Sequence, residues 1–191
     1  MANSKLIVVE GPQGAGKTTT TDFLRHTLSY TNLYRLSGTA DSSKDGLKKA
    51  TDMYETLLNY VETLENLSIN LVFDRTFFTE ENYCRLGKKE YSFTEVYNKL
   101  LERFSKLDFD IYYITLYLED ESKYEERLAR SGKATFAVSK FGVENSISQQ
   151  KVYLDMAKEI KEKYPNINVI NIKSDRPLEE VQKEIREKVG Y

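Results

Sequence analysis

The chain has 191 residues, of which 40% are hydrophobic and 30% charged, and this is the composition of one ordinary folded domain. Its 28 basic and 30 acidic residues give a net charge of −2, so no overall positive field attracts nucleic acid. A single cysteine, Cys84, excludes an internal disulfide, and a single histidine, His26, leaves Ser–His catalysis, Cys–His catalysis and His/Cys metal sites without a strong candidate.

Short apolar runs alternate with amphipathic stretches along the chain. β-branched and aromatic residues mark the predicted strands, and apolar residues three and four positions apart mark the predicted helices. In chain order the pattern predicts strand 5–9, helix 18–30, strand 33–36, helix 47–64, strand 69–73, helices 79–86 and 96–107, strand 111–118, helices 122–130 and 147–164, strand 167–172 and helix 178–189.

Strands that alternate with helices favour a parallel sheet covered by helices on both faces. We therefore predict an α/β fold, a three-layer sandwich with a five-stranded parallel sheet, as one domain over residues 1–191. No signal peptide precedes the first strand, and no apolar run approaches the ~20 residues that span a bilayer. We expect a cytoplasmic protein without membrane contact.

The residues from Gly11 to Thr18 fit the phosphate-binding pattern G-x-x-x-x-G-K-[ST], between a predicted strand and a predicted helix as this motif requires. The glycines let successive N–H groups turn toward a phosphate, and the helix N-terminus adds positive potential. Lys17 would contact the β- and γ-phosphates, and the Thr18 hydroxyl would bind Mg²⁺. A plain glycine-rich turn is the alternative. The predicted nucleotide-binding residues are Gly11, Gln13, Gly14, Ala15, Gly16, Lys17, Thr18 and Thr19.

Charged residues also follow two other predicted strands. Asp74 and Arg75 follow the third strand, where Asp74 could accept a proton from an attacking hydroxyl or help to hold a metal's water shell. The planar guanidinium of Arg75 could bridge two phosphates. The alternatives are an ordinary ion pair for Asp74 and Arg75, and a solvated cation for Arg35 at the end of the second strand.

These motifs together resemble those of the thymidylate kinases and, more distantly, the deoxynucleoside kinases. Residues 9–19 are similar to F-E-G-x-x-G-x-G-K-T-T, and residues 34–39 to T-R-E-P-G-G-T. Residues 73–83 are similar to D-R-Y-x-x-S-x-x-A-Y-Q. The resemblance implies a P-loop kinase fold, ATP as phosphoryl donor, Mg²⁺, an acceptor phosphate bound by Arg35, and a homodimer formed through the long helix. An N-K-x-D motif, which a GTPase would need, is missing.

Several positions depart from the thymidylate kinase pattern. Gln13 stands where that family usually has an acidic residue, Leu36-Ser37 replaces Glu-Pro, and Cys84 replaces a glutamine. The long helix has no arginine matching the family's second ligand for the acceptor phosphate. The acceptor is therefore left open between a deoxynucleoside monophosphate, a free deoxynucleoside and a modified analogue of either.

Four basic residues, Arg127, Arg130, Lys133 and Lys140, lie within or just before the segment 131–142, where the resemblance implies a lid. Closing basic side chains over the transferring phosphate would exclude water, and the alternative is a solvated basic loop. Arg127 and Arg130 are favoured over the lysines because a guanidinium fork matches phosphate. The loop 173–177 is the usual place for the donor base. Phe77, Phe78 and Tyr83 could clamp the acceptor base, with Met53 and Tyr54 opposite.

We therefore predict ATP- and Mg²⁺-dependent phosphoryl transfer to a deoxynucleoside monophosphate. A deoxynucleoside kinase acting on the 5′-hydroxyl is the alternative, and a nucleic-acid kinase or an inactive nucleotide-binding regulator is less favoured. The predicted catalytic residues are Lys17, Asp74, Arg75, Arg127 and Arg130. The predicted acceptor-binding residues are Glu10, Gln13, Arg35, Asp74, Arg75, Phe78 and Tyr83.

Overall fold

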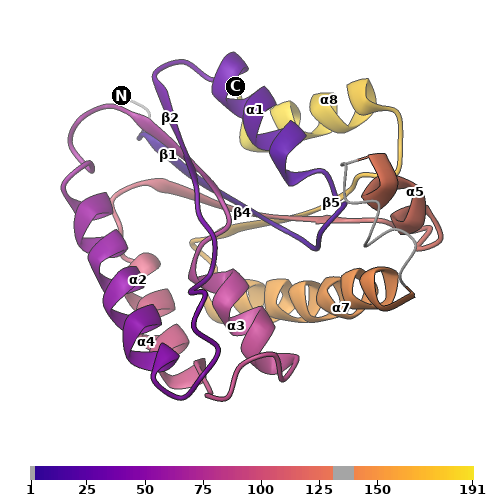
Figure 1. The fold of residues 1–191 in the computed structure, drawn as a ribbon. Helices are drawn as coiled ribbons and strands as arrows, with labels where there is room; N and C mark the ends of the chain where they lie inside the picture. Colours follow the sequence, from indigo (N-terminus) through magenta and orange to yellow (C-terminus); the bar gives the residue numbers. More distant parts are fainter. Residues whose placement is uncertain (1–2, 131–139) are drawn as a thin grey trace.

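The structure, a computed structural model, describes residues 3–130 and 140–191. Its strands are β1 (Lys5–Glu10), β2 (Thr31–Arg35), β3 (Asn70–Asp74), β4 (Asp110–Tyr117) and β5 (Asn168–Lys173). They form one parallel sheet in the order β2-β3-β1-β4-β5 (Figure 1). The described helices are α1 (Lys17–Thr27), α2 (Gly46–Glu62), α3 (Phe77–Arg85), α4 (Thr94–Phe104), α5 (Lys123–Arg130), α7 (Lys140–Lys163) and α8 (Leu178–Val189).

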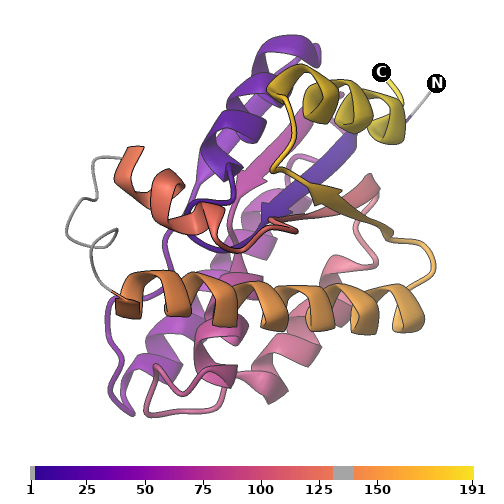
Figure 2. The ribbon, with the colours of Figure 1, turned by 90° about the vertical axis from the view of Figure 1, so that its right-hand side faces the viewer.

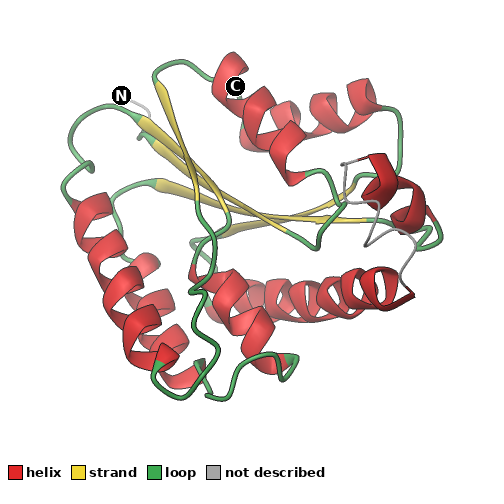
Figure 3. Ribbon diagram, viewed as in Figure 1, coloured by secondary structure: helices red, strands yellow, loops and turns green. Residues whose placement is uncertain are grey.

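Helices cover both faces of this sheet, as predicted. Helices α1 and α8 lie on one face, and α2, α3, α4 and α7 lie on the other (Figure 3). Strand β1 explains why both faces must be covered: Leu6 and Val8 join one apolar core and Ile7 and Val9 join the other, and all four are fully buried. A strand buried on both faces carries a continuous apolar run, which the sequence has here. The predicted three-layer α/β sandwich is confirmed.

The boundary of α7 differs from the prediction. This helix begins at Lys140, whereas the periodicity predicted a start at 147. It is a long helix that lies against β4 and β5 (Figure 2). Gly142 therefore lies inside this helix. A glycine inside a helix costs only about 1 kcal/mol relative to alanine, and tertiary contacts can offset that cost. The last residues of the predicted lid, 140–142, belong to α7, and residues 131–139 of that lid lie outside the described residues.

Strand register brings three distant segments to one edge of the sheet. Asp74, the last residue of β3, pairs with Val9 of β1 on one side and with Arg35 of β2 on the other. Gly11 follows directly after β1. The carboxyl ends of parallel strands form the usual ligand-binding edge of such a sheet. Among the helices of residues 3–130 and 140–191, none has both the length and the apolar character needed to cross a membrane.

Candidate active site

The phosphate loop has a conformation that two of its glycines make possible. Gly11 has φ of 145°, and a Cβ there would lie 2.7 Å from the carbonyl oxygen of Leu116. Gly16 has φ of 99° and directly precedes α1. L-residues with side chains rarely adopt such backbone angles. The loop therefore follows the tight path from β1 into α1 that the motif predicts.

The loop opens into a cavity of about 520 Å³ at the carboxyl edge of the sheet. Residues of the phosphate loop, β2, β3 and α5 line it. They are Gln13, Gly14, Gly16, Lys17, Thr18, Thr19, Arg35, Leu36, Asp74, Arg75, Arg127 and Arg130. Within the part of the chain that the structure describes, the lining thus has five basic side chains and one carboxylate. This excess of positive charge suits a polyanion.

Lys17 lies at the mouth of the loop. Its Nζ donates hydrogen bonds to the carbonyl oxygens of Gly11 at 2.6 Å and Pro12 at 2.8 Å. The side chain is nearly buried, with 6% exposed. An ammonium held over the loop in this way can interact with a phosphate bound by the loop.

Thr18, the residue after Lys17, brings its hydroxyl next to the carboxylate of Asp74. The Thr18 Oγ lies 3.5 Å from Asp74 Oδ2, and Asp74 is 6% exposed. Hydroxyl and carboxylate oxygens are the ligands that Mg²⁺ prefers, and it commonly takes its other ligands from phosphates and water. The residues present therefore fit the ion that the motif predicts.

Arg35 joins this pair from β2. Its Nε lies 3.7 Å from Asp74 Oδ2, and its Nη2 lies 2.5 Å from Asp22 Oδ1 on α1. Asp22 was not predicted as part of the site, although it stands four residues after Thr18 and so lies on the same side of α1. Helical spacing from the motif was the signal that could have found it.

Arg75 has a strained backbone, with φ of 71° in a residue other than glycine. Such a conformation costs on the order of 1–3 kcal/mol and persists only where surrounding contacts impose it. Here the Arg75 N–H donates to the Val9 carbonyl at 3.2 Å, and the Thr76 N–H donates to Glu10 Oε1 at 2.8 Å. Strand β1 thus holds the turn that presents Arg75 to the cavity.

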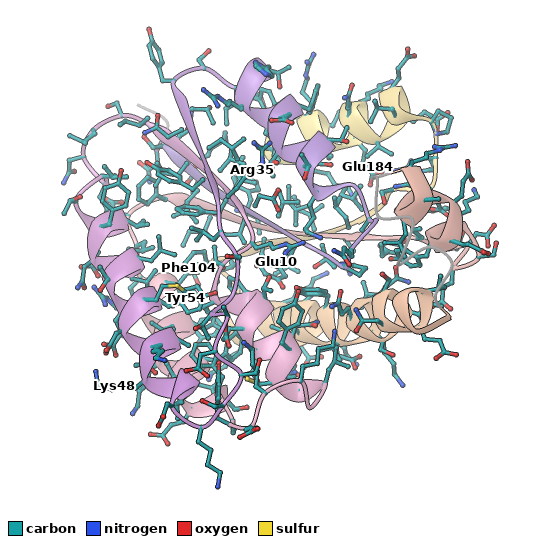
Figure 4. The ribbon with its side chains drawn as sticks, viewed as in Figure 1. Glu10, Arg35, Lys48, Tyr54, Phe104 and Glu184 are labelled. Atoms are coloured by element: carbon teal, nitrogen blue, oxygen red, sulfur yellow. The ribbon has the colours of Figure 1, made fainter. Side chains whose placement is uncertain are left out.

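Glu10 lies beneath the cavity rather than on its surface. Its carboxylate is fully buried and accepts hydrogen bonds of 2.8 Å from the Thr76 N–H and the Thr79 hydroxyl. Burial raises the pKa of Glu10 to about 7, although both hydrogen bonds and the nearby charges of Lys17 and Arg75 oppose that rise. Figure 4 shows Glu10 in the interior of the protein. In this structure Glu10 supports the Arg75–Thr76 turn.

Glu10→Gln is expected to change how stability depends on pH. The pKa of Glu10 in the folded protein, about 7, exceeds its ordinary value of 4.5, so the folded state keeps a proton that the unfolded chain releases between these values. This contribution to stability is complete below 4.5 and is lost as the pH rises to about 7, by up to about 3 kcal/mol. Glutamine does not titrate, so the variant should lose this decline. Urea unfolding of both proteins between pH 4.5 and 7 tests the prediction. An equal decline of the free energy of unfolding with pH in the two proteins would contradict it.

Arg127 connects the phosphate loop to the loop after β5. Its guanidinium lies 3.5 Å from the Gly14 carbonyl oxygen and donates to the Ser174 carbonyl at 2.5 Å. Beside it is a second, smaller cavity of about 190 Å³, lined by Ala15, Gly16, Thr19, Thr20, Arg127, Ser174, Arg176, Leu178 and Val181. Arg130, one turn further along α5, pairs with Glu126 and lines the larger cavity. The 173–177 loop, which is predicted to lie at the donor base, thus contributes Ser174 and Arg176 to the lining of the smaller cavity.

The predicted aromatic clamp requires a correction. Phe78 is fully buried in the core, where its ring stacks on Phe77 with centroids 4.3 Å apart and meets Tyr113 at 4.6 Å. A ring enclosed by other rings presents no face to a nucleobase, so the assignment of Phe78 to acceptor binding is wrong. Tyr83, by contrast, is half-buried, and Lys88 Nζ lies 5.0 Å from its ring centroid.

No protein-family model and no curated protein sequence matches the chain. It is similar to the solved structure of thymidylate kinase from Candida albicans, with a TM-score of 0.67 and 16% identity over 99% of this chain and 92% of that one. Thymidylate kinase from Ehrlichia chaffeensis matches with a TM-score of 0.62 and 18% identity over 98% and 99% of the two chains. Deoxyadenosine kinase from M. mycoides with bound dCTP matches with 0.59 and 20% over 96% and 98%. The chain has the fold of these P-loop kinases. This kinase fold confirms the fold that the motifs predicted.

Proposed function

We propose that this protein is a kinase that transfers the γ-phosphoryl group of ATP to a deoxynucleoside monophosphate, with Mg²⁺ as cofactor. One observation carries the proposal: a phosphate loop, a strand-end Asp-Arg pair and arginines from β2 and α5 line one cavity with five basic side chains. In-line transfer needs little covalent chemistry from a protein and depends on positioning and on charge stabilisation. The residues at this edge of the sheet are of the types that such catalysis uses.

On the donor side, the N–H groups of the loop would bind the β-phosphate, and Lys17 would neutralise charge on the γ-phosphate. Thr18 and Asp74 would hold Mg²⁺, which when bound neutralises phosphate charge. The acceptor oxygen would bond to the γ-phosphorus as the bond to the β–γ bridging oxygen breaks, and ADP would leave. Arg127, which lines the smaller cavity, would contact the base or the phosphates of ATP. Arg130, which lines the larger cavity, would help to exclude water from the transferring phosphate.

On the acceptor side, Arg35 and Arg75 would bind the monophosphate. Both line the cavity beside Asp74. A phosphate bound there would compete with Asp22 and Asp74 for the guanidinium of Arg35. Gln13 and Tyr83 would contact the nucleoside. A monophosphate is already ionised, so it needs no strong base for attack.

A specific observation favours the second candidate, a deoxynucleoside kinase. The two lysines at the start of α2 do not enter the site: Lys48 pairs with Asp52 and projects from the protein (Figure 4), and Lys49 pairs with Asp41. Helix α2 therefore offers no cation for an acceptor phosphate, while Asp74 could accept the proton of a sugar hydroxyl.

The test is ADP release from Mg·ATP with deoxynucleosides, their 5′-monophosphates and a single-stranded DNA 5′-end as acceptors. We expect turnover with one or more monophosphates, above the rate without acceptor. Turnover with unphosphorylated nucleosides alone would replace the proposal with the second candidate. ATP binding without turnover on any acceptor would instead indicate a nucleotide-binding regulator.

A further inference from the structure

The P-loop residue Gln13 is held by a helix that comes more than a hundred residues later in the chain. Its carbonyl oxygen accepts a 2.9 Å hydrogen bond from the Ser146 hydroxyl of α7. Its N–H donates to the Gln149 Oε1 of the same helix at 3.4 Å. Both polar groups of one loop peptide position are therefore occupied by side chains of one helix turn.

These two side chains are buried polar groups. Ser146 is fully buried, and Gln149 is 4% exposed. Burying a hydroxyl or an amide is unfavourable unless it is hydrogen-bonded, and an apolar residue would fill the same space without that cost. Both side chains form hydrogen bonds with the backbone of Gln13. The polar side chains at these two positions of α7 are therefore explained by their hydrogen bonds to the phosphate loop, which packing alone would not require.

The same turn of α7 also contacts α3 and the residues that follow it. The Asn82 side-chain amide of α3 donates to the Gln149 carbonyl oxygen at 3.1 Å. Lys88, after α3, donates to the Asn145 side chain. Helix α3 follows directly on the turn that carries Asp74 and Arg75. One helix turn thus links the donor loop to the element that positions the strand-end pair.

We propose that Ser146 and Gln149 are positioning residues for phosphoryl transfer: through Gln13 they fix the phosphate loop relative to α3. The proposal rests on the proposed function. Neither residue lines the catalytic cavity, so both act through Gln13. A hydrogen bond of this kind changes an equilibrium by about three- to tenfold. The shorter bond of Ser146 should matter more than the longer bond of Gln149.

The test compares Ser146→Ala and Gln149→Met with a matched control, Gln150→Met. Gln150 lies on the same helix and is 5% exposed, but its side-chain amide bonds the backbone of Leu118 at 2.8 and 3.0 Å and accepts from the Tyr124 hydroxyl, with no hydrogen bond to the phosphate loop among the described interactions. Calorimetry would measure binding of tripolyphosphate, which reports on the loop alone, and of Mg·ADP. Thermal unfolding of each variant would measure stability, and steady-state kinetics would separate kcat from KM for ATP.

We expect Ser146→Ala to weaken tripolyphosphate binding by about three- to tenfold, Gln149→Met to weaken it less, and Gln150→Met to lower Tm without changing binding. Wild-type affinity in both Ser146→Ala and Gln149→Met would overturn the inference. So would an equal loss of affinity in Gln150→Met, because the effect would then come from loosening α7 in general. Failure of the wild-type protein to bind Mg·ADP and tripolyphosphate would overturn the proposed function itself.

Discussion

Lys17→Ala is expected to lower turnover by about a hundred- to a thousandfold while leaving the fold intact. The Nζ of Lys17 lies at the mouth of the phosphate loop, held by the carbonyl oxygens of Gly11 and Pro12. In the transition state, negative charge on the transferring group is stabilised by preorganised positive groups, and losing one such group costs on the order of a hundred- to a thousandfold. Lys17 is also nearly buried, so water replaces its charge poorly.

Lys17→Arg is the matched control for that experiment. It keeps the positive charge but replaces a compact ammonium with a larger, planar guanidinium. Its turnover should therefore lie between that of the wild-type protein and that of Lys17→Ala. Circular dichroism and Tm should be close to wild type for both variants, since the hydrogen bonds from Lys17 to Gly11 and Pro12 stay within one loop. Wild-type turnover in Lys17→Ala would contradict the donor side of the proposed mechanism.

The sequence was sufficient for the fold and for the course of the glycine loop because both have local signatures. Strand β1 is a continuous apolar run followed at once by the glycine motif, and the long amphipathic helices keep a regular period. The position of Asp74 at a strand end was likewise visible from the end of an apolar run. Its pairing with Arg35 follows from strand register, once the order β2-β3-β1 is known.

The errors arose where the answer depends on contacts between distant segments. Phe78 stands four residues after Asp74, but α3 begins at Phe77 and turns that ring into the core against Tyr113 of β4. An aromatic residue near a site looks the same in sequence whether it stacks on a base or on another ring. Ser146 and Gln149 lie 133 and 136 residues from Gln13. Their partners cannot be read from a single sequence.

Asp74→Asn is expected to lower turnover by about a hundredfold or more and to raise the Mg²⁺ concentration needed for activity. The substitution keeps the size of the side chain but removes the charge that lies 3.5 Å from the Thr18 hydroxyl. A neutral amide is a weaker ligand for Mg²⁺ than a carboxylate. With a sugar hydroxyl as acceptor, the amide would also accept no proton, a role that contributes about a hundred- to ten-thousandfold. Turnover measured over a range of Mg²⁺ at fixed ATP would show both effects.

Asp22→Asn distinguishes this role of Asp74 from simple anchoring of Arg35. Both carboxylates contact Arg35, at 2.5 Å from Asp22 and at 3.7 Å from Asp74, but only the Asp74 carboxylate lies within hydrogen-bond distance of the Thr18 hydroxyl among the described interactions. The Arg35–Asp22 pair is about half exposed, and such pairs contribute about 0–1 kcal/mol, so Asp22→Asn should change turnover only a few-fold. If Asp22→Asn were as damaging as Asp74→Asn, with an unchanged Mg²⁺ requirement in both, the common cause would be displacement of Arg35. A large effect confined to Asp74→Asn would instead assign the metal and the attacking group to the end of β3.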